Sequence, residues 1–511
     1  MTITVQAQTA PSARAIFLLI AQGADVRKHS WFRKLPAAVQ QTVLAFVKAQ
    51  EFTGKADEVR VIPFGTSARA VVLLGLGDPK AFTHRQAMLA CRKVVNITKQ
   101  HRLEHAAVAL PDIAILDWTV EHRAQLAAEN FQLAHYEYTT YRTTPPGGWP
   151  QVKSIALVVP AADVRAAQRG ARAGSIIGQA TNSARDLSNT PGSDMTPTIL
   201  ANAAVAAGKR AGFSVTVLKK DALEKLGMGG VLGVARGSTH APTFTVLEYA
   251  AVGQKKDAPI VYLGKGVTFD SGGLNLKPSA SMYEMHMDMS GGAAVISALT
   301  AIAQLKLPVR VIGLIPAVEN VSAGDAYRPG DQLRSLSGKT IEVMDTDAEG
   351  RIILADALTY AEQFKPAAVI DVATLTGAAL HALGQHASAI LSPDDNFSRE
   401  LQNLAEQSGD FGWPLPLWPE YEAEIRGMFG DVSNTGKSRY GGAITGAAFL
   451  WQFAKKFKRW AHVDIAPTMT TIDGQHLAKG SAGAGTRLLI AYARSPRDAA
   501  KRSGRARRHH A

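Results

Sequence analysis

Seven ionisable residues between Gly264 and Arg351 stand among glycines and small residues instead of on the polar face of a helix. Three segments carry them: LGKGVTFDSGGLNLKP (263–278), MHMDMSGGAAV (285–295) and DTDAEGR (345–351). The residues are Lys265, Asp270, Lys277, Asp288, Asp347, Glu349 and Arg351. Carboxylates gathered in this way need opposite charge beside them. The fold must therefore place partner charges against them.

Apolar strand patterns and helical patterns alternate along the chain, which is typical of sheets flanked by helices. In the first part, strand patterns at 15–21, 59–64, 70–77 and 155–160 accompany a helical pattern at 84–100. We predict a smaller N-terminal α/β domain over residues 1–163. The segment LGLGDP (74–79) has only two glycines of a dinucleotide fingerprint and ends in Pro79. We interpret it as a turn that ends a strand rather than as a nucleotide site.

A long helical pattern at 164–189 stops at Pro191 and Gly192, which predicts a connecting helix over 164–192. A second α/β pattern follows, with helices predicted at 198–212, 293–304 and 352–364 and strands predicted at 213–218, 243–250, 259–264, 309–317 and 367–375. At 511 residues the chain exceeds one typical core. We therefore predict a second, larger domain over residues 193–493.

The ionisable residues fall at the ends of these predicted elements. Lys265 and Asp270 follow a predicted strand, Asp288 precedes a predicted helix, and 347–351 lies between a strand and a helix. Open α/β sheets place their sites in loops at the carboxyl ends of strands. The pattern favours one convergent pocket.

Asp270, Asp288, Asp347 and Glu349 are hard oxygen ligands, and no His or Cys cluster in the sequence competes for a tetrahedral zinc site. Any one of them taken alone could be a helix cap or a surface acid. Together they carry four negative charges, which two divalent cations would neutralise. Such a two-metal site uses bridging carboxylates and a bridging water whose pKa falls to near 7.

The cations of this stretch allow several roles. Lys277 can remain an ammonium and stabilise a developing oxyanion. Lys265 is either an ordinary cation or, beside two dications, a neutral amine that binds one of them. Arg351 cannot act as a base, because a guanidinium keeps its proton in proteins. It can hold a small anion that moves the proton.

Composition limits the remaining classes. The chain is 46% hydrophobic and 19% charged, as in globular proteins, and its single cysteine, Cys91, excludes an internal disulfide. We interpret Cys91 as a buried apolar residue and, with no membrane span in the sequence, expect a cytoplasmic protein. The net charge of +13 makes nucleic acid a partner to consider. The basic tail, 494–511, is expected to be a disordered, solvated extension, with a nucleic-acid-binding arm as the alternative.

The segments GKGVTFDSGGLNLKP, MDMSGG and TDAEGR resemble the signature segments of the leucyl aminopeptidase (cytosol aminopeptidase) family of dinuclear metal exopeptidases. The resemblance continues in ARDLSNTPG (184–192), DVATLTGA (371–378), ITGAAFL (444–450) and HVDIA (462–466). It implies a C-terminal catalytic domain with a mixed sheet flanked by helices. It also implies a homohexamer that releases N-terminal leucine and other apolar residues from short peptides.

The resemblance further implies a role for each residue that matches the family's pattern. Asp270 and Glu349 would bridge two metal ions, Mn²⁺ or Zn²⁺; Lys265 and Asp288 would complete the tightly held site, and Asp347 the readily exchanged one. Lys277 would polarise the scissile carbonyl, and Arg351 would hold a bicarbonate that acts as the general base. The substrate-binding residues would be Met285, Thr374, Leu375, Gly377, Ala466 and Met469.

Two positions depart from the family's pattern. Asp345 stands where the family usually has Asn, and His286 stands where it commonly has Lys. Neither change removes an implied ligand, so we expect both to be tolerated. A second hypothesis, from another class, is a DNA-binding regulatory role through the basic surface. The sequence contains no helix-turn-helix or zinc-finger pattern for base readout.

Overall fold

The computed structural model describes residues 1–7, 13–29, 31–64, 69–110 and 118–495. The chain divides into two compact units. The first comprises Met1–Asn189 and Thr470–Ala482, and the second comprises Thr190–Met469 and the chain from Gly483 onward. This division differs from the ranges expected from the sequence in two places. The helix at 164–189 and the segment 470–482 both lie with the first unit.

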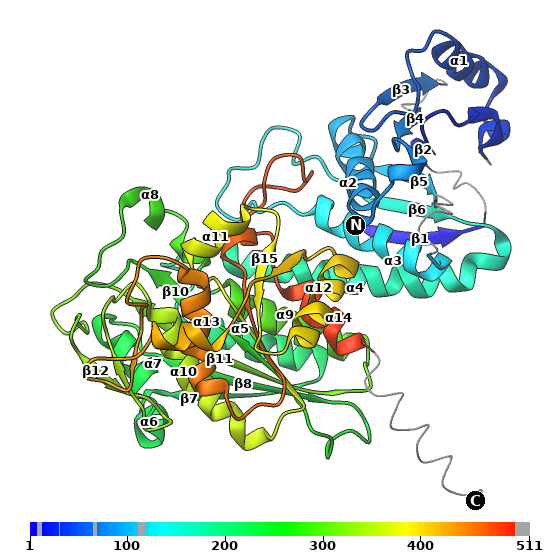
Figure 1. Cartoon of the computed structure of the whole chain (residues 1–511). Coiled ribbons are helices and arrows are strands. Elements are labelled where there is room, and N and C mark those ends of the chain that lie inside the picture. Colours follow the sequence, from blue (N-terminus) through cyan, green and yellow to red (C-terminus); the bar gives the residue numbers. More distant parts are fainter. Residues whose placement is uncertain (8–12, 30, 65–68, 111–117, 496–511) are drawn as a thin grey trace, which may run out of the picture. The chain divides into compact units, whose positions relative to one another are not determined.

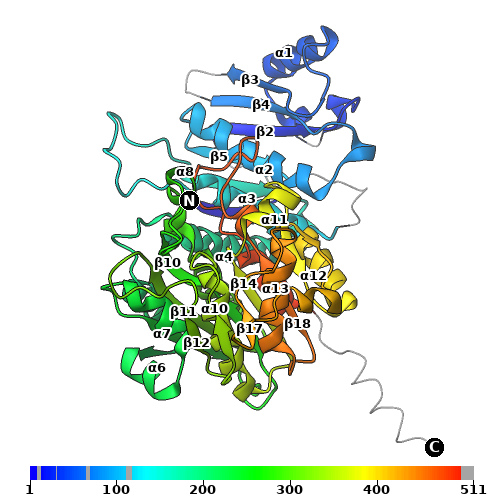
Figure 2. The ribbon, with the colours of Figure 1, turned by 60° about the vertical axis from the view of Figure 1, so that its left-hand side comes forward.

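The first unit contains a six-stranded sheet in the order β1-β6-β5-β2-β4-β3. Its strands are β1 (Thr2–Gln6), β2 (Ala15–Ile20), β3 (Val59–Phe64), β4 (Arg69–Gly75), β5 (His105–Ala109) and β6 (Ser154–Val158). All neighbours are parallel except the edge strand β3, which runs antiparallel to β4. Figures 1 and 2 show β2, β4 and β3 side by side. Strand β4 ends at Gly75, so LGLGDP contains the end of a strand, as expected.

Helices cover both faces of this sheet. They are α1 (Ala37–Lys48), α2 (His84–Gln100), α3 (Val120–His135) and α4 (Val164–Asn189). Leu18 and Ile20 of β2 share a core with Val39 and Val43 of α1, while Leu19 lies on the side of α2 and α3. This alternation follows from the two-residue period of a strand.

Helices α3 and α4 pack closely because α4 carries a glycine every fourth residue. A Cβ on Gly170 or on Gly174 would lie 2.0 Å from a backbone oxygen of α3. A Cβ on Gly178 would lie 2.7 Å from the Cβ of Gln132. Any side chain at these positions would force the two helices apart.

The second unit is built on a nine-stranded mixed sheet in the order β16-β15-β18-β14-β9-β11-β8-β7, with β10 paired to β11. The strands are β7 (Ser214–Lys219), β8 (Thr243–Ala250), β9 (Ile260–Gly264), β10 (Gly266–Asp270), β11 (Arg310–Asn320), β14 (Ala368–Ala373), β15 (Ser388–Leu391), β16 (Gly412–Pro414) and β18 (Trp460–Asp464). A separate small sheet contains β12 (Gln332–Arg334), β13 (Thr340–Glu342) and β17 (Val432–Ser433). Central strands β18, β14, β9 and β11 are mutually parallel, so their carboxyl ends lie at one edge.

The helices of the second unit are α5 (Pro197–Ala211), α6 (Lys220–Leu226), α7 (Gly229–Val234), α8 (Ser279–Met282), α9 (Ser290–Gln304), α10 (Glu349–Ala361), α11 (Gly377–Leu383), α12 (Asp395–Ser408), α13 (Gly442–Ala454) and α14 (Thr486–Arg494). Helices α5 and α9 pack against the sheet, and α14 packs against α9. Helices α7, α10 and α13 form with the strands a single apolar core that includes Val261, Ile312, Ile353 and Phe449. These layers confirm the predicted fold class: a smaller N-terminal α/β domain and a larger C-terminal domain with a mixed sheet flanked by helices.

Three smaller expectations can be compared with the structure. Cys91 is buried on α2, and burial raises the pKa of its thiol to about 12, as expected for an unreactive apolar residue. Among the described residues, no helix has the length and hydropathy needed to cross a bilayer. The basic tail expected over 494–511 falls almost wholly outside the described residues, which end at Ser495.

Candidate metal centre and active site

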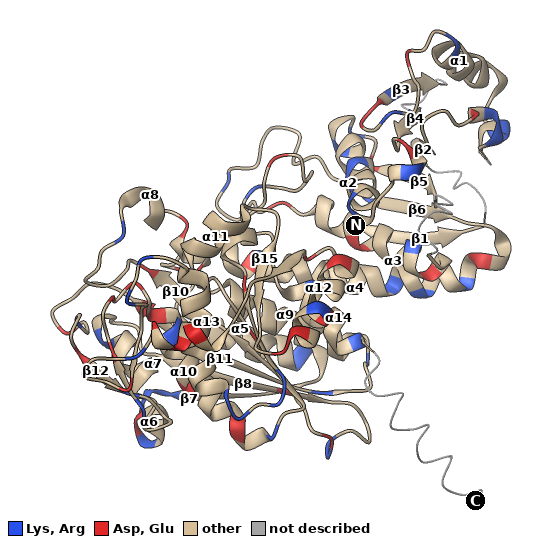
Figure 3. Ribbon diagram, in the orientation of Figure 1, with Lys and Arg blue, Asp and Glu red and all other residues tan. Residues whose placement is uncertain are grey.

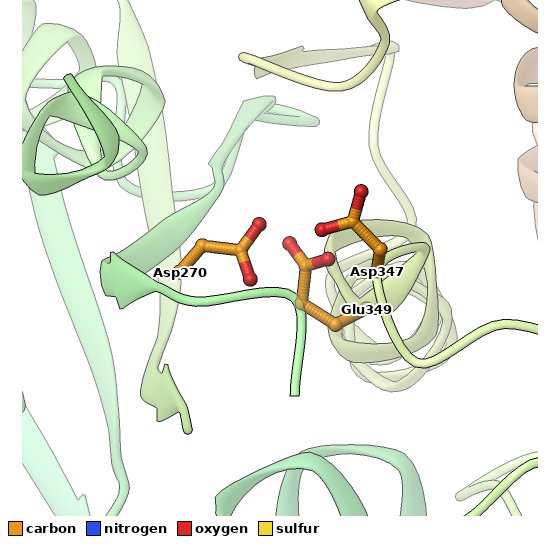
Figure 4. A group of neighbouring side chains, drawn as sticks. All are labelled: Asp270, Asp347 and Glu349. Carbon is orange, nitrogen blue, oxygen red and sulfur yellow. The ribbon is translucent and has the colours of Figure 1, made fainter. Parts of the chain in front are cut away.

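Three carboxylates meet at the strand edge of the second unit. Asp270 is the last residue of β10, Glu349 is the first residue of α10, and Asp347 lies two residues before that helix. One oxygen from each of the three lies within 4.8 Å of the others. Figure 4 shows the side chains converging from the two segments. The structure thus brings together groups that lie almost 80 residues apart in the sequence.

Lys265 and Asp288 join this cluster. Lys265 lies between β9 and β10, and its Nζ is 2.8 Å from Asp288 Oδ1 and 2.8 Å from Glu349 Oε1. The same Nζ donates a hydrogen bond of 2.9 Å to the carbonyl of Thr374. A Cβ on Gly350 would lie 2.5 Å from Lys265 Cε. Glycine at this position therefore leaves the room that the buried lysine side chain occupies.

Lys277 contacts the other side of the cluster. Its Nζ lies 2.9 Å from Asp270 Oδ2 and 2.5 Å from Asp347 Oδ1. Burial lowers the pKa of both lysines, but the adjacent carboxylates outweigh it, and the pKa of each is raised above its ordinary value. Both lysines are therefore ammonium groups in this arrangement, and Lys265 would need to lose a proton before it could bind a metal through nitrogen.

Burial and the neighbouring charges shift the pKa values of the four carboxyl groups. Burial, together with the charge of Glu349, raises the pKa of Asp270 to about 7. Burial also raises the pKa of Asp288 well above its ordinary value, against the effect of Lys265. Burial and the charge of Glu349 raise the pKa of Asp347. For Glu349 itself, burial is outweighed by the two lysine cations, which lower its pKa. The four carboxylates of the cluster therefore carry more negative charge than its two lysines neutralise.

The cluster fits divalent cations by charge and by donor type. Its four carboxylates are paired with two lysines, which leaves two negative charges when all groups are ionised. Asp288 Oδ2 is buried and accepts no hydrogen bond from any described residue. Carboxylate oxygens are the hard ligands that such cations bind. Metal binding would supply both the missing charge and a partner for this oxygen.

Arg351 is buried on the first turn of α10. Its Nη1 donates a hydrogen bond of 2.7 Å to the carbonyl of Asn434. Its Nε is buried and has no hydrogen-bond partner among the described residues. Burial lowers the pKa of this guanidinium, although Glu349 and nearby aspartates oppose the shift. A cationic side chain whose N–H donor has no partner can bind a small anion.

Two loops that carry carboxylates of the cluster are tied together by residues that the sequence analysis did not single out. Asn320 Nδ2 donates to Asp270 Oδ1 at 2.8 Å and to the carbonyl of Thr346 at 2.9 Å. Tyr327 donates its hydroxyl to the same carbonyl at 2.7 Å. Thr346 Oγ1 in turn donates to the carbonyl of Gly272 at 2.6 Å. These bonds fix the loop after β10 against the loop before α10.

Asn434, which is fully buried, holds the DTDAEGR loop from the other side. Its Nδ2 donates to the carbonyls of Asp345 at 2.6 Å and Ala348 at 3.3 Å. Its Oδ1 accepts from the backbone N–H of Met344 at 2.7 Å and of Asp345 at 3.3 Å. Asn434 therefore positions the loop that carries Asp347 and Glu349. In the sequence, the one indication of a role for Asn434 is that it lies shortly before segment 444–450, which resembles a segment of the family.

Asp345 makes a local turn. Its Oδ1 accepts a hydrogen bond of 2.8 Å from the backbone N–H of Asp347. An asparagine, which the resemblance leads us to expect at this position, can accept the same bond through its own Oδ1. His286, the second departure, is half-buried in the short helical turn Met285–Met287, and burial lowers its pKa.

The residues expected to bind substrate come from three segments. Met285, half-buried, begins the turn that leads to Asp288. Leu375 and Ala466 are brought together by buried Asp464, whose Oδ1 accepts from both of their backbone N–H groups, at 3.0 and 3.1 Å. Gly377 begins α11, which packs against the helical turn Ala466–Thr468 that Met469 follows.

Thr374, expected with the substrate-binding residues, is buried and serves the cluster directly. Its Oγ1 donates to Asp288 Oδ1 at 2.7 Å, and its carbonyl accepts from Lys265. The polar groups of Thr374 are therefore occupied by the cluster. Only its methyl group is left to face a substrate.

A carboxylate cluster of this kind at the strand edge of an α/β domain could hold metal ions, as in metal-dependent enzymes, and comparison with known proteins gives the family of this chain. The model of the cytosol aminopeptidase family catalytic domain matches residues 182–490, and the model of that family's N-terminal domain matches residues 17–145. The chain belongs to the cytosol aminopeptidase family. Membership supports a metal-dependent aminopeptidase, a hydrolase that acts on peptides.

Relatives and solved structures match nearly the whole chain. The probable cytosol aminopeptidase of Geobacter sulfurreducens is 40% identical over 502 residues, which cover 96% of this chain and 99% of the relative. That of Azoarcus sp. (strain BH72) is 39% identical over 500 residues, covering 96% and 98%. The structure of the bottromycin maturation enzyme BotP in complex with Mn has a TM-score of 0.82 and 32% identity, and the match covers 94% of this chain and 99% of that one.

Proposed function

We propose that the protein is a leucyl aminopeptidase that releases N-terminal leucine and other apolar residues from short peptides with two divalent cations, Mn²⁺ or Zn²⁺. The observation that carries this proposal is the convergence of Asp270, Asp347 and Glu349, with one oxygen of each within 4.8 Å of the others, beside the Lys265–Asp288 pair. A catalytic centre of this composition has more carboxylate charge than its own lysines neutralise.

In the proposed site, Asp270 and Glu349 would help to hold both cations; Glu349 lies against Lys265 and Asp270 lies against Lys277. Lys265 and Asp288 would hold one cation with them, and Asp347 would hold the other. When bound, the two cations supply a water of lowered pKa as the nucleophile and polarise the scissile carbonyl. Thr374 fixes the orientation of Asp288 through its hydroxyl hydrogen bond.

Lys277 is the proposed electrophilic residue. Its raised pKa keeps it an ammonium at neutral pH, and only a small part of its side chain is exposed. From its place beside Asp270 and Asp347 it can donate a hydrogen bond to the oxygen that becomes negative in the transition state. One such donor is worth roughly 2.7 to 4 kcal/mol of barrier.

Arg351 is the proposed holder of bicarbonate, the anion that would serve as general base. The buried Nε without a partner and the Nη1 bond to the carbonyl of Asn434 support this role. The Asn434 contact restrains one end of the guanidinium. The buried Nε is then left to donate to an anion, and a planar guanidinium suits a planar anion.

The proposed pocket for the substrate side chain comprises Met285, Thr374, Leu375, Gly377, Ala466 and Met469. The Asp464 hydrogen bonds hold two of its segments together, and the Thr374 methyl group is what that residue can contribute. Small and apolar groups of this kind favour leucine over a charged residue.

Assembly as a homohexamer and location in the cytoplasm are part of the proposal. Large apolar side chains on the second unit support the assembly: Tyr283 is 84% exposed, and Met428 and Phe429 are each 82% exposed. The DNA-binding alternative has less support, because Lys and Arg are interspersed with Asp and Glu along both units in Figure 3. A gel shift at low salt that persists without residues 494–511 would establish DNA binding by the rest of the chain.

The deciding experiment compares leucine amide with N-acetyl-leucine amide on chelator-treated protein, with and without added Mn²⁺ or Zn²⁺. We expect metal-dependent hydrolysis of the free-amine substrate alone. Glu349→Gln should abolish hydrolysis, because it removes a shared carboxylate. The matched control is Glu362→Gln, just beyond the other end of α10, whose surface pair with Lys456 contributes little. Equal cleavage of both substrates, or full activity of the Glu349 variant, would refute the proposal.

A further inference from the structure

A cavity of about 730 Å³ lies within the first unit, and none of the carboxylate-cluster residues lines it. Its lining includes the residue that directly follows each of the five mutually parallel strands. These residues are Ala7 after β1, Ala21 after β2, Leu76 after β4, Leu110 after β5 and Val159 after β6. The cavity therefore opens at the carboxyl edge of the sheet, where open α/β sheets bind ligands.

The strand order explains why a cavity forms there. From β2 the chain moves to β3 and β4 on one side of the sheet, and from β5 it moves to β6 on the other. The connection after β2 passes through α1, which packs on the face of Leu18, whereas the connection after β5 passes through α3 on the face of Leu19. Neighbouring connections that leave toward opposite faces create a crevice between β2 and β5.

The polar groups of the cavity are mainly cationic. Lys28, Lys34 and Arg123 line it together with Asp25 and Asp163. Asp25 is already paired, because Arg27 Nε lies 2.9 Å from its Oδ1 and the hydrogen bond from Arg27 lowers the pKa of this carboxyl. Lys28 and Lys34 have no such acidic partner among the described residues, so the lining is positively charged beside Asp163.

Two further features complete the chemistry. Val120 and Arg123 are in the first turn of α3, so the N-terminus of this 16-residue helix adds partial positive charge at the cavity wall. Trp31 and Phe82 are buried and line the cavity, which gives it aromatic walls. His29 also lines it, and burial lowers its pKa to about 4, so that it is neutral at pH 7.

We propose that this cavity binds a nucleoside phosphate, with the base against the aromatic wall of Trp31 and Phe82 and the phosphate at Lys28 and Lys34. The volume suits a ligand of this size, since small-molecule sites measure roughly 300 to 1,000 Å³. The proposal does not depend on a dinucleotide fingerprint, which 74–79 lacks. It is also independent of the peptidase site, because the two sets of residues belong to different units.

The test measures binding of AMP to the full chain by titration calorimetry, with inorganic phosphate and adenosine as competitors. We expect one AMP per chain and weaker competition by each fragment alone. The double variant Lys28→Glu, Lys34→Glu should weaken AMP binding by about tenfold or more, because charge-assisted bonds are lost. Both lysines are exposed, so the fold should tolerate the change.

The matched control is Arg33→Glu, an exposed residue that neighbours Lys34 but does not line the cavity. It should leave AMP binding within about twofold, and neither variant should change leucine amide hydrolysis. Three results would overturn the proposal: no AMP binding at millimolar concentration, equal weakening by the control, or failure of adenosine to compete. The last would mean a site for phosphate without a nucleoside subsite.

Discussion

Replacing Asn434 by alanine removes the side chain that holds the DTDAEGR loop. The change deletes the 2.6 Å bond to the carbonyl of Asp345 and the 2.7 Å bond from the N–H of Met344, together with two bonds of 3.3 Å. It keeps the backbone carbonyl that accepts from Arg351. The variant therefore tests loop positioning while it leaves every charged group of the cluster in place.

The magnitude follows from the two short bonds. A buried backbone group left without its partner costs about 1 to 3 kcal/mol. Met344 is half exposed, so water can partly replace its bond. We therefore expect the substitution to destabilise the ordered loop by about 2 to 4 kcal/mol in total. If all of this free energy is needed to order the loop, the equilibrium constant for ordering falls by at most roughly 30-fold to 1,000-fold.

Because this loop carries Asp347 and Glu349, the loss should appear in metal binding. We expect the affinity for Mn²⁺, measured by titration calorimetry, to weaken by at least about tenfold, and kcat/KM for leucine amide at limiting metal to fall with it. Saturating Mn²⁺ should restore part of the rate. The control is Asn403→Ala, an exposed position on α12. Wild-type Mn²⁺ affinity in Asn434→Ala would refute the positioning role.

Three other perturbations have outcomes fixed by the geometry. Lys277→Ala should retain or tighten metal binding, because it removes a cation beside Asp270 and Asp347, yet lower kcat by about 10²-fold to 10³-fold; metal loss measured by plasma emission would instead make Lys277 structural. Asp345→Asn should change kcat/KM by less than about threefold, because the amide oxygen accepts the same 2.8 Å bond from Asp347, and a collapse in rate would contradict this. Asp270 has a pKa raised from 3.8 to about 7, so its carboxyl stabilises the metal-free fold below pH 4 and this stability is lost as pH rises through 7. The melting temperature of metal-free protein should therefore fall between about pH 4 and 7, and Mn²⁺ affinity should rise over that range with release of protons; an affinity independent of pH would exclude this coupling.

Helices and strands whose apolar residues recur at a regular spacing were predictable from the sequence. Helix α2 and strands β3 and β8 begin and end where their patterns indicate. Helix α3 gave no such signal, because its buried face carries polar residues, among them Glu129, Asn130 and Gln132. Asn130 accepts a bond of 2.8 Å from Arg92 of α2, so polar pairing replaces apolar contact there. Regularly spaced apolar residues cannot reveal a helix whose buried face is polar.

The same distinction applies to the candidate site. Charged residues among glycines are conspicuous, and the structure brings Lys265, Asp270, Lys277, Asp347 and Glu349 into contact distance. The neutral positioning groups were not conspicuous. Asn434 acts on backbone atoms 89 residues away in the sequence, so no local spacing marks it. The roles of the charged groups in catalysis stay predictions until the variants above are measured.

Residues 470–482 belong to the first unit, although residues 190–469 of the second unit precede them in the chain. This order has a consequence for biosynthesis. Arg185, fully buried on α4, donates to the carbonyl of Ser481 at 2.8 Å and to that of Ala478 at 2.9 Å. The ribosome makes the intervening residues 190–469 before these acceptors exist. At about 5 to 20 residues per second, the N-terminal unit waits roughly 15 to 60 s for its last segment. During that interval Nε and Nη2 of Arg185 lack these acceptors, whereas Nη1 can already donate to the carbonyl of Leu133. The nascent N-terminal unit therefore reaches its final hydrogen bonding only as translation nears its end.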